Sequence, residues 1–281
     1  MSRLNINEIL APSLNLGGES KRDSVSEKFL SDVQCAISKY NKINRRKSSM
    51  FYKPSSLVCD RQMFYQRTGA EADDKYDDYK GIGMADTGTR RHVAIQEILE
   101  ELDKLGYEWE YLDVADYVEK KHNDGKILDT KVNGTRGHET HLVHDTLHVS
   151  CMCDGIIRNT RTNEYYLFEF KNQISFKAGK HARDIDSSHE EQIVAYCTLL
   201  DLDKVLMLYE NRDTCELYCP NVFHVGEGAK KAFKFKLIEV ERYVINNTIP
   251  KANKGCSMCK WCNYKTLCEK HGVNECSNSL E

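Results

Sequence analysis

Three segments of the chain repeat apolar residues every three or four positions, the spacing of one face of an α-helix. This spacing predicts helices over Gly88–Leu105, from Ser188 to about Leu202, and over Glu227–Ile245. Ser188 and Glu191 form a capping box that opens the second helix. The first helix carries one stripe that we expect to face inward, formed by His92, Ile95, Leu99 and Leu102.

Strand patterns alternate with these helices. Asp145–Arg158 and Glu164–Lys171 flank a turn at 159–163, which predicts a β-hairpin. Lys204–Glu210 and Glu216–Val225 predict a further pair of strands. The order of helix, strands, helix, strands and helix favours an α/β fold in which a mixed central β-sheet is flanked by helices.

The beginning of the chain differs from the rest. We interpret residues 1–49 as an N-terminal accessory extension, which includes a helical pattern over Ser24–Ile43, and residues 50–281 as the main domain. A short helix is predicted from Pro54 through Arg67, with Ser55 or Ser56 as its N-cap. Residues 107–146 are polar and irregular, and their pattern predicts no more than one or two strands.

Composition narrows the class of protein. A chain of 281 residues is long enough to bury a large core. It contains no apolar stretch of membrane-spanning length and no basic-then-apolar start typical of a secretory signal, which predicts a cytoplasmic protein. The formal net charge of −3 gives no overall attraction to nucleic acid, so any such contact must use local positive charge.

The predicted hairpin carries two acids and a lysine. With Arg158 opposite Tyr165, Asp154 lies directly across from Glu169, and Lys171 shares the face of Glu169. Opposed carboxylates repel each other, and a bound cation turns that repulsion into coordination. Hard oxygen ligands suit Mg²⁺ or Mn²⁺ better than zinc.

The alternative for this face is a solvated strand with an incidental ion pair. Burial of the strand Tyr165–Phe170 favours a metal site, because buried charges are costly unless they are paired or coordinated. His92 is a candidate third ligand, and its alternative is a hydrogen-bonded core histidine. Gln192 and Tyr196 stand one helical turn apart, so we expect both to point the same way.

Cysteines give a second and independent signal. The chain has twelve, and without a secretory signal we expect their thiols to stay reduced. Four of them occur at ligand-like spacings in a polar segment near the C-terminus, namely Cys256, Cys259, Cys262 and Cys268.

The ordered set of His92, Asp154, Glu169-x-Lys171 and Gln192-xxx-Tyr196 resembles the RecB-like branch of the PD-(D/E)xK nuclease superfamily. Cys59, within Ser55–Tyr65, together with Cys259-xx-Cys262-xxxxx-Cys268, resembles the iron–sulfur members of that branch, among them CRISPR-adaptation exonucleases and phage recombination nucleases. The resemblance covers about Ser55 to Cys268 and leaves out the first fifty residues and the 107–146 insert.

The resemblance implies a restriction-endonuclease-like core and a role for each matched residue. His92, Asp154, Glu169 and the Phe170 carbonyl would bind Mg²⁺ or Mn²⁺. Lys171 would be the catalytic lysine, and Gln192 and Tyr196 would contact the substrate backbone. A [4Fe–4S] cluster would join the N- and C-terminal segments through Cys59, Cys259, Cys262 and Cys268.

Two alternatives remain for the cysteines. Structural zinc also takes four thiolates, and Cys256 has the spacing to replace Cys259.

The function that these features predict is a divalent-metal-dependent deoxyribonuclease. By resemblance it would be an exonuclease acting from DNA ends in phage or prokaryotic recombination, repair or end processing, with other recombination or replication proteins as partners. Candidate contacts to nucleic acid are Arg61, Arg90, Arg91, Lys177 and Lys180. The alternatives are a catalytically silent nucleic-acid-binding adaptor that keeps a structural metal cluster, and a nuclease that cuts internally or acts on RNA.

Overall fold

A computed structural model of the chain describes residues 24–44, 49–73, 79–136, 138–175, 184–253, 259 and 262–271. The described elements fall into two compact units. The first holds α2 (Ser24–Asn44), none of whose residues is buried, and the start of α4 (Tyr79–Leu99). The second unit holds all the other elements and the candidate site.

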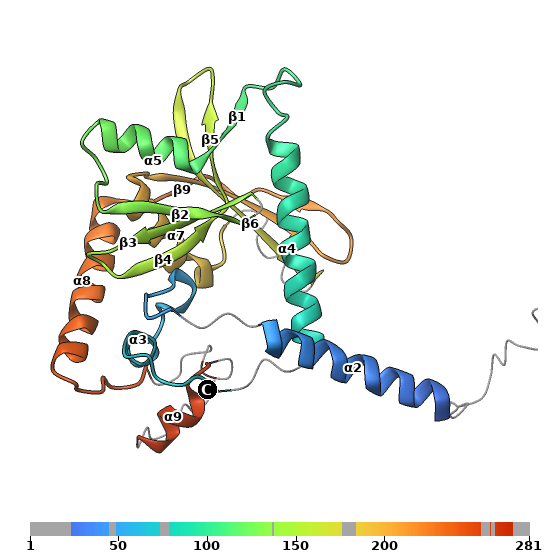
Figure 1. Cartoon of the computed structure of the whole chain (residues 1–281). Coiled ribbons are helices and arrows are strands. Elements are labelled where there is room, and N and C mark those ends of the chain that lie inside the picture. Colours follow the sequence, from blue (N-terminus) through green and yellow to red (C-terminus); the bar gives the residue numbers. More distant parts are fainter. Residues whose placement is uncertain are drawn as a thin grey trace, which may run out of the picture. The chain divides into compact units, whose positions relative to one another are not determined.

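The second unit follows a mixed order of helices and strands (Figure 1). Its helical elements, besides most of α4, are η1 (Pro54–Ser56), α3 (Asp60–Arg67), α5 (Val114–Asn123), α7 (Ser187–Leu200), α8 (Glu227–Ile245) and α9 (Lys265–Lys270). Its strands are β1 (Trp109–Leu112), β2 (Thr130–Arg136), β3 (Glu139–His144), β4 (Val149–Cys153), β5 (Gly155–Asn159), β6 (Glu164–Gln173), β7 (Lys204–Asn211), β8 (Leu217–Tyr218) and β9 (Phe223–His224).

The described strands form two sheets. The larger has six strands in the order β1-β5-β6-β7-β8, with β9 also paired to β7. It is mixed, because β6 and β7 are parallel and joined through α7, whereas its other pairs are antiparallel. The smaller sheet has three antiparallel strands in the order β2-β3-β4. A mixed α/β fold with a mixed central sheet flanked by helices is therefore present, as the sequence predicts.

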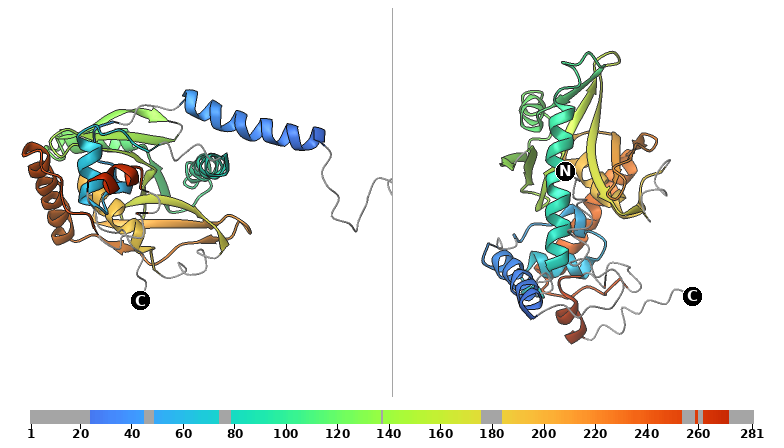
Figure 2. Two further views of the ribbon diagram at one scale, coloured as in Figure 1. Left: turned by 90° about the horizontal axis from the view of Figure 1, so that it is seen from below. Right: turned by 90° about the vertical axis from the view of Figure 1, so that its right-hand side faces the viewer.

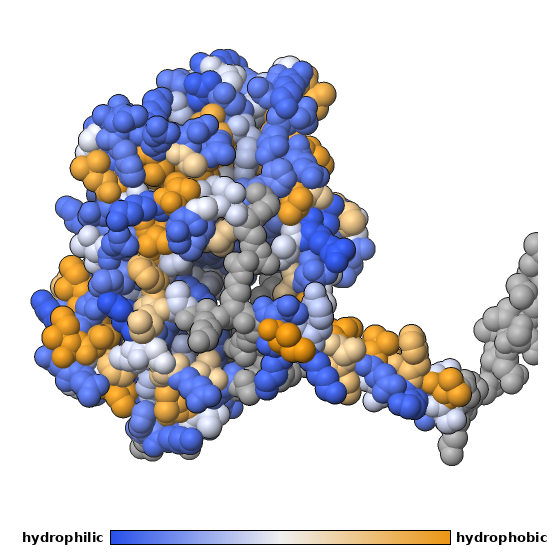
Figure 3. Space-filling model, in the orientation of Figure 1, coloured by the Kyte–Doolittle hydropathy of each residue, from blue (hydrophilic) through white to orange (hydrophobic). Residues whose placement is uncertain are grey.

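Alternation along β6 divides the core between the two faces of the larger sheet. Phe168 and Phe170 pack with Ile95 of α4 on one face. Leu167 packs on the other face, in the core that contains Ile193 of α7 and Leu237 of α8. Helices thus cover both faces (Figures 1 and 2). The face drawn in Figure 3 is mainly hydrophilic, with some apolar side chains over α8, where Phe235 and Ile238 are exposed.

Several predicted boundaries are correct. The last amphipathic helix spans Glu227–Ile245 as predicted, and the hairpin has the predicted register, with Arg158 opposite Tyr165. The predicted strand over 204–210 is β7, one residue longer.

Other boundaries are wrong for identifiable reasons. The segment 145–158 is two strands in two different sheets, since the chain passes from β4 to β5 at Asp154. The helix predicted over 88–105 is α4, which begins nine residues earlier and ends six earlier. Asp186 caps α7 in place of Ser188, because its carboxylate accepts a hydrogen bond from the Ser188 backbone at 3.0 Å.

The remaining corrections concern short or polar segments. The helix predicted from Pro54 through Arg67 is divided into η1 and α3, and Cys59 is the N-cap residue of α3. The strand predicted over 216–225 is reduced to β8 and β9. The polar region 107–146 contains β1, α5, β2 and β3, more structure than its pattern predicts.

Candidate active site

A cavity of about 320 Å³ opens between the two sheets, α4 and α7. Most of the residues singled out from the sequence line it, namely His92, Asp154, Glu169, Lys171, Gln192 and Tyr196. They come from four separate elements or junctions. The fold therefore brings into one cavity residues that are spread over about a hundred positions of the sequence.

Asp154 lies at the junction where the chain leaves β4 and enters β5. Its backbone carbonyl accepts hydrogen bonds from the Tyr111 hydroxyl and from Gln96 Nε2, the latter at 2.5 Å. Its Oδ2 accepts a hydrogen bond from the Phe170 backbone N–H at 2.8 Å. These contacts fix a carboxylate that is only 3 % exposed at the edge of the larger sheet, facing the cavity.

Glu169 and Lys171 share one face of β6, as alternation predicts. Lys171 Nζ donates to Glu169 Oε1, and Gln192 Nε2 donates to the same oxygen at 2.9 Å. Gln192 Nε2 also donates to the Tyr196 hydroxyl at 2.8 Å, so the two α7 side chains do point the same way. The second oxygen of Glu169, Oε2, is buried and has no hydrogen-bond partner among the described residues.

Electrostatics in the cavity are strongly perturbed. Burial, followed by the charge of Asp154, raises the pKa of Glu169 to about 7. Burial alone would lower the pKa of Lys171, but the neighbouring charges of Glu169 and Asp154 raise it overall. Burial alone would likewise lower the pKa of His92, but the hydrogen bond to Asp154 and the charges of Asp154 and Glu169 raise it overall. Perturbed pKa values of this kind cluster at functional sites and also occur in structural ion-pair networks.

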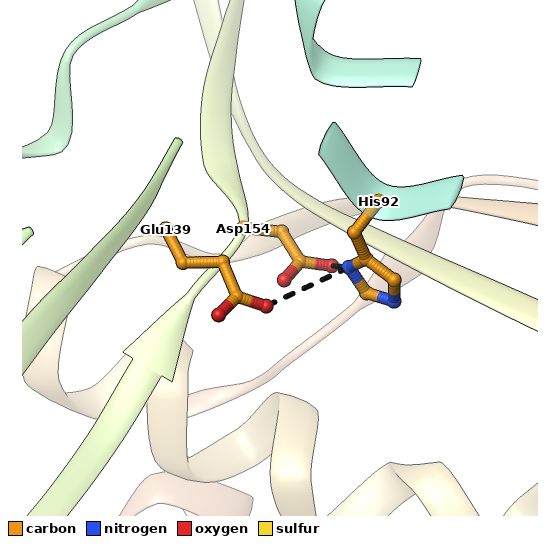
Figure 4. A group of neighbouring side chains, drawn as sticks. All are labelled: His92, Glu139 and Asp154. Carbon is orange, nitrogen blue, oxygen red and sulfur yellow. Dashed lines mark ion pairs between the residues drawn. The ribbon is translucent and has the colours of Figure 1, made fainter. Parts of the chain in front are cut away.

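A group of side chains that could hold a metal ion lies at the α4 side of the cavity, and it includes a residue that the sequence interpretation missed. His92 Nδ1 lies 3.3 Å from Asp154 Oδ2 and 3.7 Å from Glu139 Oε1. One ligand atom from each of the three side chains lies within 4.8 Å of the others. Figure 4 shows the imidazole and both carboxylates turned toward one another. One imidazole and two carboxylates are a donor set that fits Mn²⁺ or Mg²⁺.

The sequence around Glu139 contains a strand pattern that could have been recognised. It begins β3, where Thr140 and Leu142 are buried and the residues on either side of Thr140 are half-buried. That alternation is present in the letters Glu-Thr-His-Leu-Val-His, inside a region whose charged residues otherwise obscure the strand pattern.

Glu169 and Phe170, both predicted metal ligands, lie on opposite faces of β6. Glu169 lines the cavity but is not part of the three-residue group. The Phe170 ring lies on the α4 face, edge-on to the His92 ring with centroids 5.0 Å apart. No described contact tests the predicted ligation by its carbonyl.

The cysteine-bearing segments lie side by side. Arg61 of α3, two residues after Cys59, donates from Nε to the Pro250 carbonyl at 2.7 Å and from Nη1 to Cys268 Sγ at 3.9 Å. Tyr65 packs against Tyr264, with Cys262 and Cys268 beside them. Cys256 lies outside the described residues. The fold thus brings the N- and C-terminal cysteine segments together, while the nature of any bound cluster stays a prediction.

The predicted nucleic-acid contacts separate into different environments. Arg61 is 8 % exposed and engaged with the C-terminal segment, which leaves it little access to a ligand. Arg90 is exposed and paired with Asp86. Arg91 is paired with the buried Glu210. Lys177 and Lys180 lie outside the described residues.

No family model matches the chain, and no curated protein matches it. Among solved structures, one described as "Crystal structure of SSO0001" matches with a TM-score of 0.43 and 15 % identity, covering 85 % of this chain and 96 % of that one. A likeness of this level establishes neither a family nor a function. No helix in the described part of the chain has the length and apolar character needed to cross a bilayer.

Proposed function

We propose that the protein is a divalent-metal-dependent phosphodiesterase that acts on DNA, and by resemblance an exonuclease that starts from DNA ends. The observation that carries the proposal is the shared cavity. It combines the ligand group of His92, Glu139 and Asp154 with a buried Glu169 that has one unsatisfied oxygen and with Lys171. A buried carboxylate oxygen without a partner is costly, and a bound cation or its water would satisfy it.

The proposed mechanism gives each side chain one task. His92, Glu139 and Asp154 would hold the ion, which when bound would polarise the phosphate and lower the pKa of a nearby water. Glu169 would orient that water or complete the ligand set. Lys171, held by Glu169 beside the cavity, would offset the negative charge that develops on the phosphate. Gln192 fixes the position of Glu169 through its 2.9 Å hydrogen bond.

The cysteines support a further part of the proposal. Cys59, Cys259, Cys262 and Cys268 would hold a [4Fe–4S] cluster that joins α3 to the C-terminal segment. Structural zinc is the alternative for the same thiolates. The packing of Tyr65 on Tyr264 and the contact from Arg61 to Cys268 support a shared site for the two segments.

The main test uses labelled single-stranded and duplex DNA, linear and circular, with Mn²⁺, Mg²⁺ or EDTA. We expect degradation of the linear forms with metal only, and a loss of at least about 100-fold in Lys171→Ala and Glu169→Ala. Lys204→Ala is a matched control, since Lys204 of β7 pairs outside the cavity with Glu164 of β6, the strand that also carries Glu169 and Lys171. Equal digestion by the wild type and the two cavity variants would contradict the proposal.

The same assay separates the alternatives. DNA binding without turnover in the wild type would favour the silent adaptor. Cutting of circular DNA would favour internal cleavage, and preference for RNA of the same sequence would favour a ribonuclease.

A further inference from the structure

The cavity has a second end whose chemistry differs from that of the metal-ligand group. The carboxylates that line the cavity are Glu139, Asp154 and Glu169. The other end is lined by groups that can donate hydrogen bonds and carry no negative charge, namely Lys53, Ser55, His141 and Ser150. The proposed function does not use any of these four.

The backbone at this end is firmly held. Tyr52 is fully buried and lies beside β4, with its N–H donating to the His148 carbonyl at 2.6 Å and its carbonyl accepting from the Ser150 N–H at 2.9 Å. Pro54 is buried as well. Lys53 lies between these two buried residues, so its backbone is fixed while its side chain is exposed at the cavity.

The side chain of Lys53 has no counter-ion in the part of the chain that the structure describes. None of the described carboxylates lies within ion-pair distance of its ammonium group, although three carboxylates line the same cavity. A lysine whose backbone is fixed at a cavity wall, and whose ammonium group has no carboxylate partner among the described residues, is suited to an anionic ligand.

The spacing along β3 relates this end to the metal-ligand group. Glu139 and His141 are two residues apart on one strand, so they share a face and lie about 6.6 Å apart along it. That spacing is comparable to the spacing of consecutive phosphates along a nucleic-acid strand. His141 Nε2 lies 2.8 Å from Ser150 Oγ, which aligns these two side chains on the wall of the cavity.

We infer that Lys53, Ser55, His141 and Ser150 bind the phosphate adjacent to the one that is cleaved. The cavity would therefore recognise two consecutive phosphodiesters of one polynucleotide strand, and its substrate would be a strand rather than a single diester. The inference rests on the proposed phosphodiesterase function. It adds a charged contact that is not a metal ligand.

The test compares two short substrates, the dinucleotide dTpdT with one phosphodiester and the trinucleotide dTpdTpdT with two, in Mn²⁺. For the full-length wild type we expect kcat/KM to be about tenfold higher for the trinucleotide, the effect of one charge-assisted contact. In Lys53→Ala this advantage should fall to about twofold or less, and Lys53→Arg should restore most of it. Lys231→Ala is the matched control, because Lys231 is exposed on α8, away from the cavity, and should leave the advantage unchanged.

A second measurement does not depend on catalysis. For binding of a single-stranded oligothymidylate in Ca²⁺, the slope of log affinity against log salt should be shallower by about 0.7 in Lys53→Ala. If the wild type cleaves both substrates and Lys53→Ala keeps the tenfold advantage and the same salt slope, the adjacent-phosphate site is wrong while the phosphodiesterase stands. If the wild type cleaves neither substrate nor longer DNA, the proposed function itself is wrong.

Discussion

Two neighbouring arginines on α4, Arg90 and Arg91, allow a test of whether a buried ion pair stabilises the helix that carries His92. Arg91 donates from Nε to Glu210 Oε2 at 2.9 Å and from Nη2 to Oε1 at 2.5 Å. The side chain of Glu210 is 1 % exposed and that of Arg91 38 % exposed. Arg90 pairs with Asp86 at 2.9 Å, but these two side chains are 79 % and 58 % exposed. The two substitutions Arg91→Ala and Arg90→Ala therefore remove the same chemistry from opposite environments.

The two substitutions should lower the free energy of unfolding by amounts that differ severalfold. Breaking a fully buried ion pair costs about 3–5 kcal/mol, because one charge is left without a partner. Since water reaches Arg91, and since Asn172 still donates to Glu210 at 2.7 Å, we expect a loss of about 2 kcal/mol in Arg91→Ala. The exposed pair of Arg90 contributes about 0.3–0.5 kcal/mol, so Arg90→Ala should be nearly neutral.

The pH dependence of the difference has a defined sign. The hydrogen bond from Arg91 lowers the pKa of Glu210 below its ordinary value. A lowered carboxyl pKa contributes stability that is present above the unfolded pKa and is lost as pH falls through the folded one. The difference in unfolding free energy between wild type and Arg91→Ala should thus be complete at pH 7. It should begin to shrink below about pH 4.5, the ordinary pKa of a glutamate, and should close as pH falls through the lower pKa of the folded state.

The assay is urea unfolding of the metal-free protein at pH 7 and at pH 4, followed by circular dichroism. Mn²⁺ affinity by titration calorimetry is the second readout. Because His92 follows Arg91 on α4, Arg91→Ala should also weaken Mn²⁺ binding, and Arg90→Ala should not. Equal costs for the two variants at pH 7, or a gap that persists unchanged at pH 4, would refute the reasoning.

Three further predictions concern the cavity and the cysteines. Burial and the charge of Asp154 raise the pKa of Glu169 to about 7, so below that pH a proton competes with the ion. Apparent Mn²⁺ affinity should therefore rise about tenfold per pH unit up to about pH 7 and then level off. The rise should be less steep in Glu169→Gln. Gly155→Ala would place a Cβ 2.7 Å from the Tyr111 hydroxyl that holds Asp154, and should lower thermal stability and Mn²⁺ affinity, whereas Gly228→Ala in α8 meets no neighbour and should lower neither. Anaerobically purified protein should contain about four iron and four sulfide per chain, lost in Cys262→Ser and kept in Cys215→Ser, and a single zinc would favour the alternative.

Local patterns in the sequence correctly predict those elements whose structure depends on interactions between residues close together in the chain. The helix over 227–245 is correct because its apolar residues repeat with a helical period from end to end and Phe233, Leu237 and Val240 are buried. The hairpin register is correct because the turn at 159–163 fixes it, with Asn159 Oδ1 accepting from the Arg161 and Thr162 backbone.

The features that the sequence does not predict depend on contacts between residues far apart in the chain. The break between β4 and β5 depends on Gln96 and Tyr111, which bind the Asp154 carbonyl from 58 and 43 residues away. Glu139 joins the candidate metal group only because β3 pairs with β4 in a separate sheet that ends beside α4. No local spacing in the sequence carries that information.

Gln66 connects α3 to the stretch that carries Lys53. From α3, which begins after Cys59, its Nε2 donates to the Phe51 carbonyl at 2.6 Å, and its Oε1 accepts from Ser56 Oγ at 3.0 Å. One amide side chain therefore grips both ends of the stretch that carries Lys53. Any disturbance that tilts α3, such as damage at the cysteines, would shift that stretch as well. A change far in the sequence from Asp154 and Glu169 would then, under the proposed function, first weaken the contact between Lys53 and the substrate.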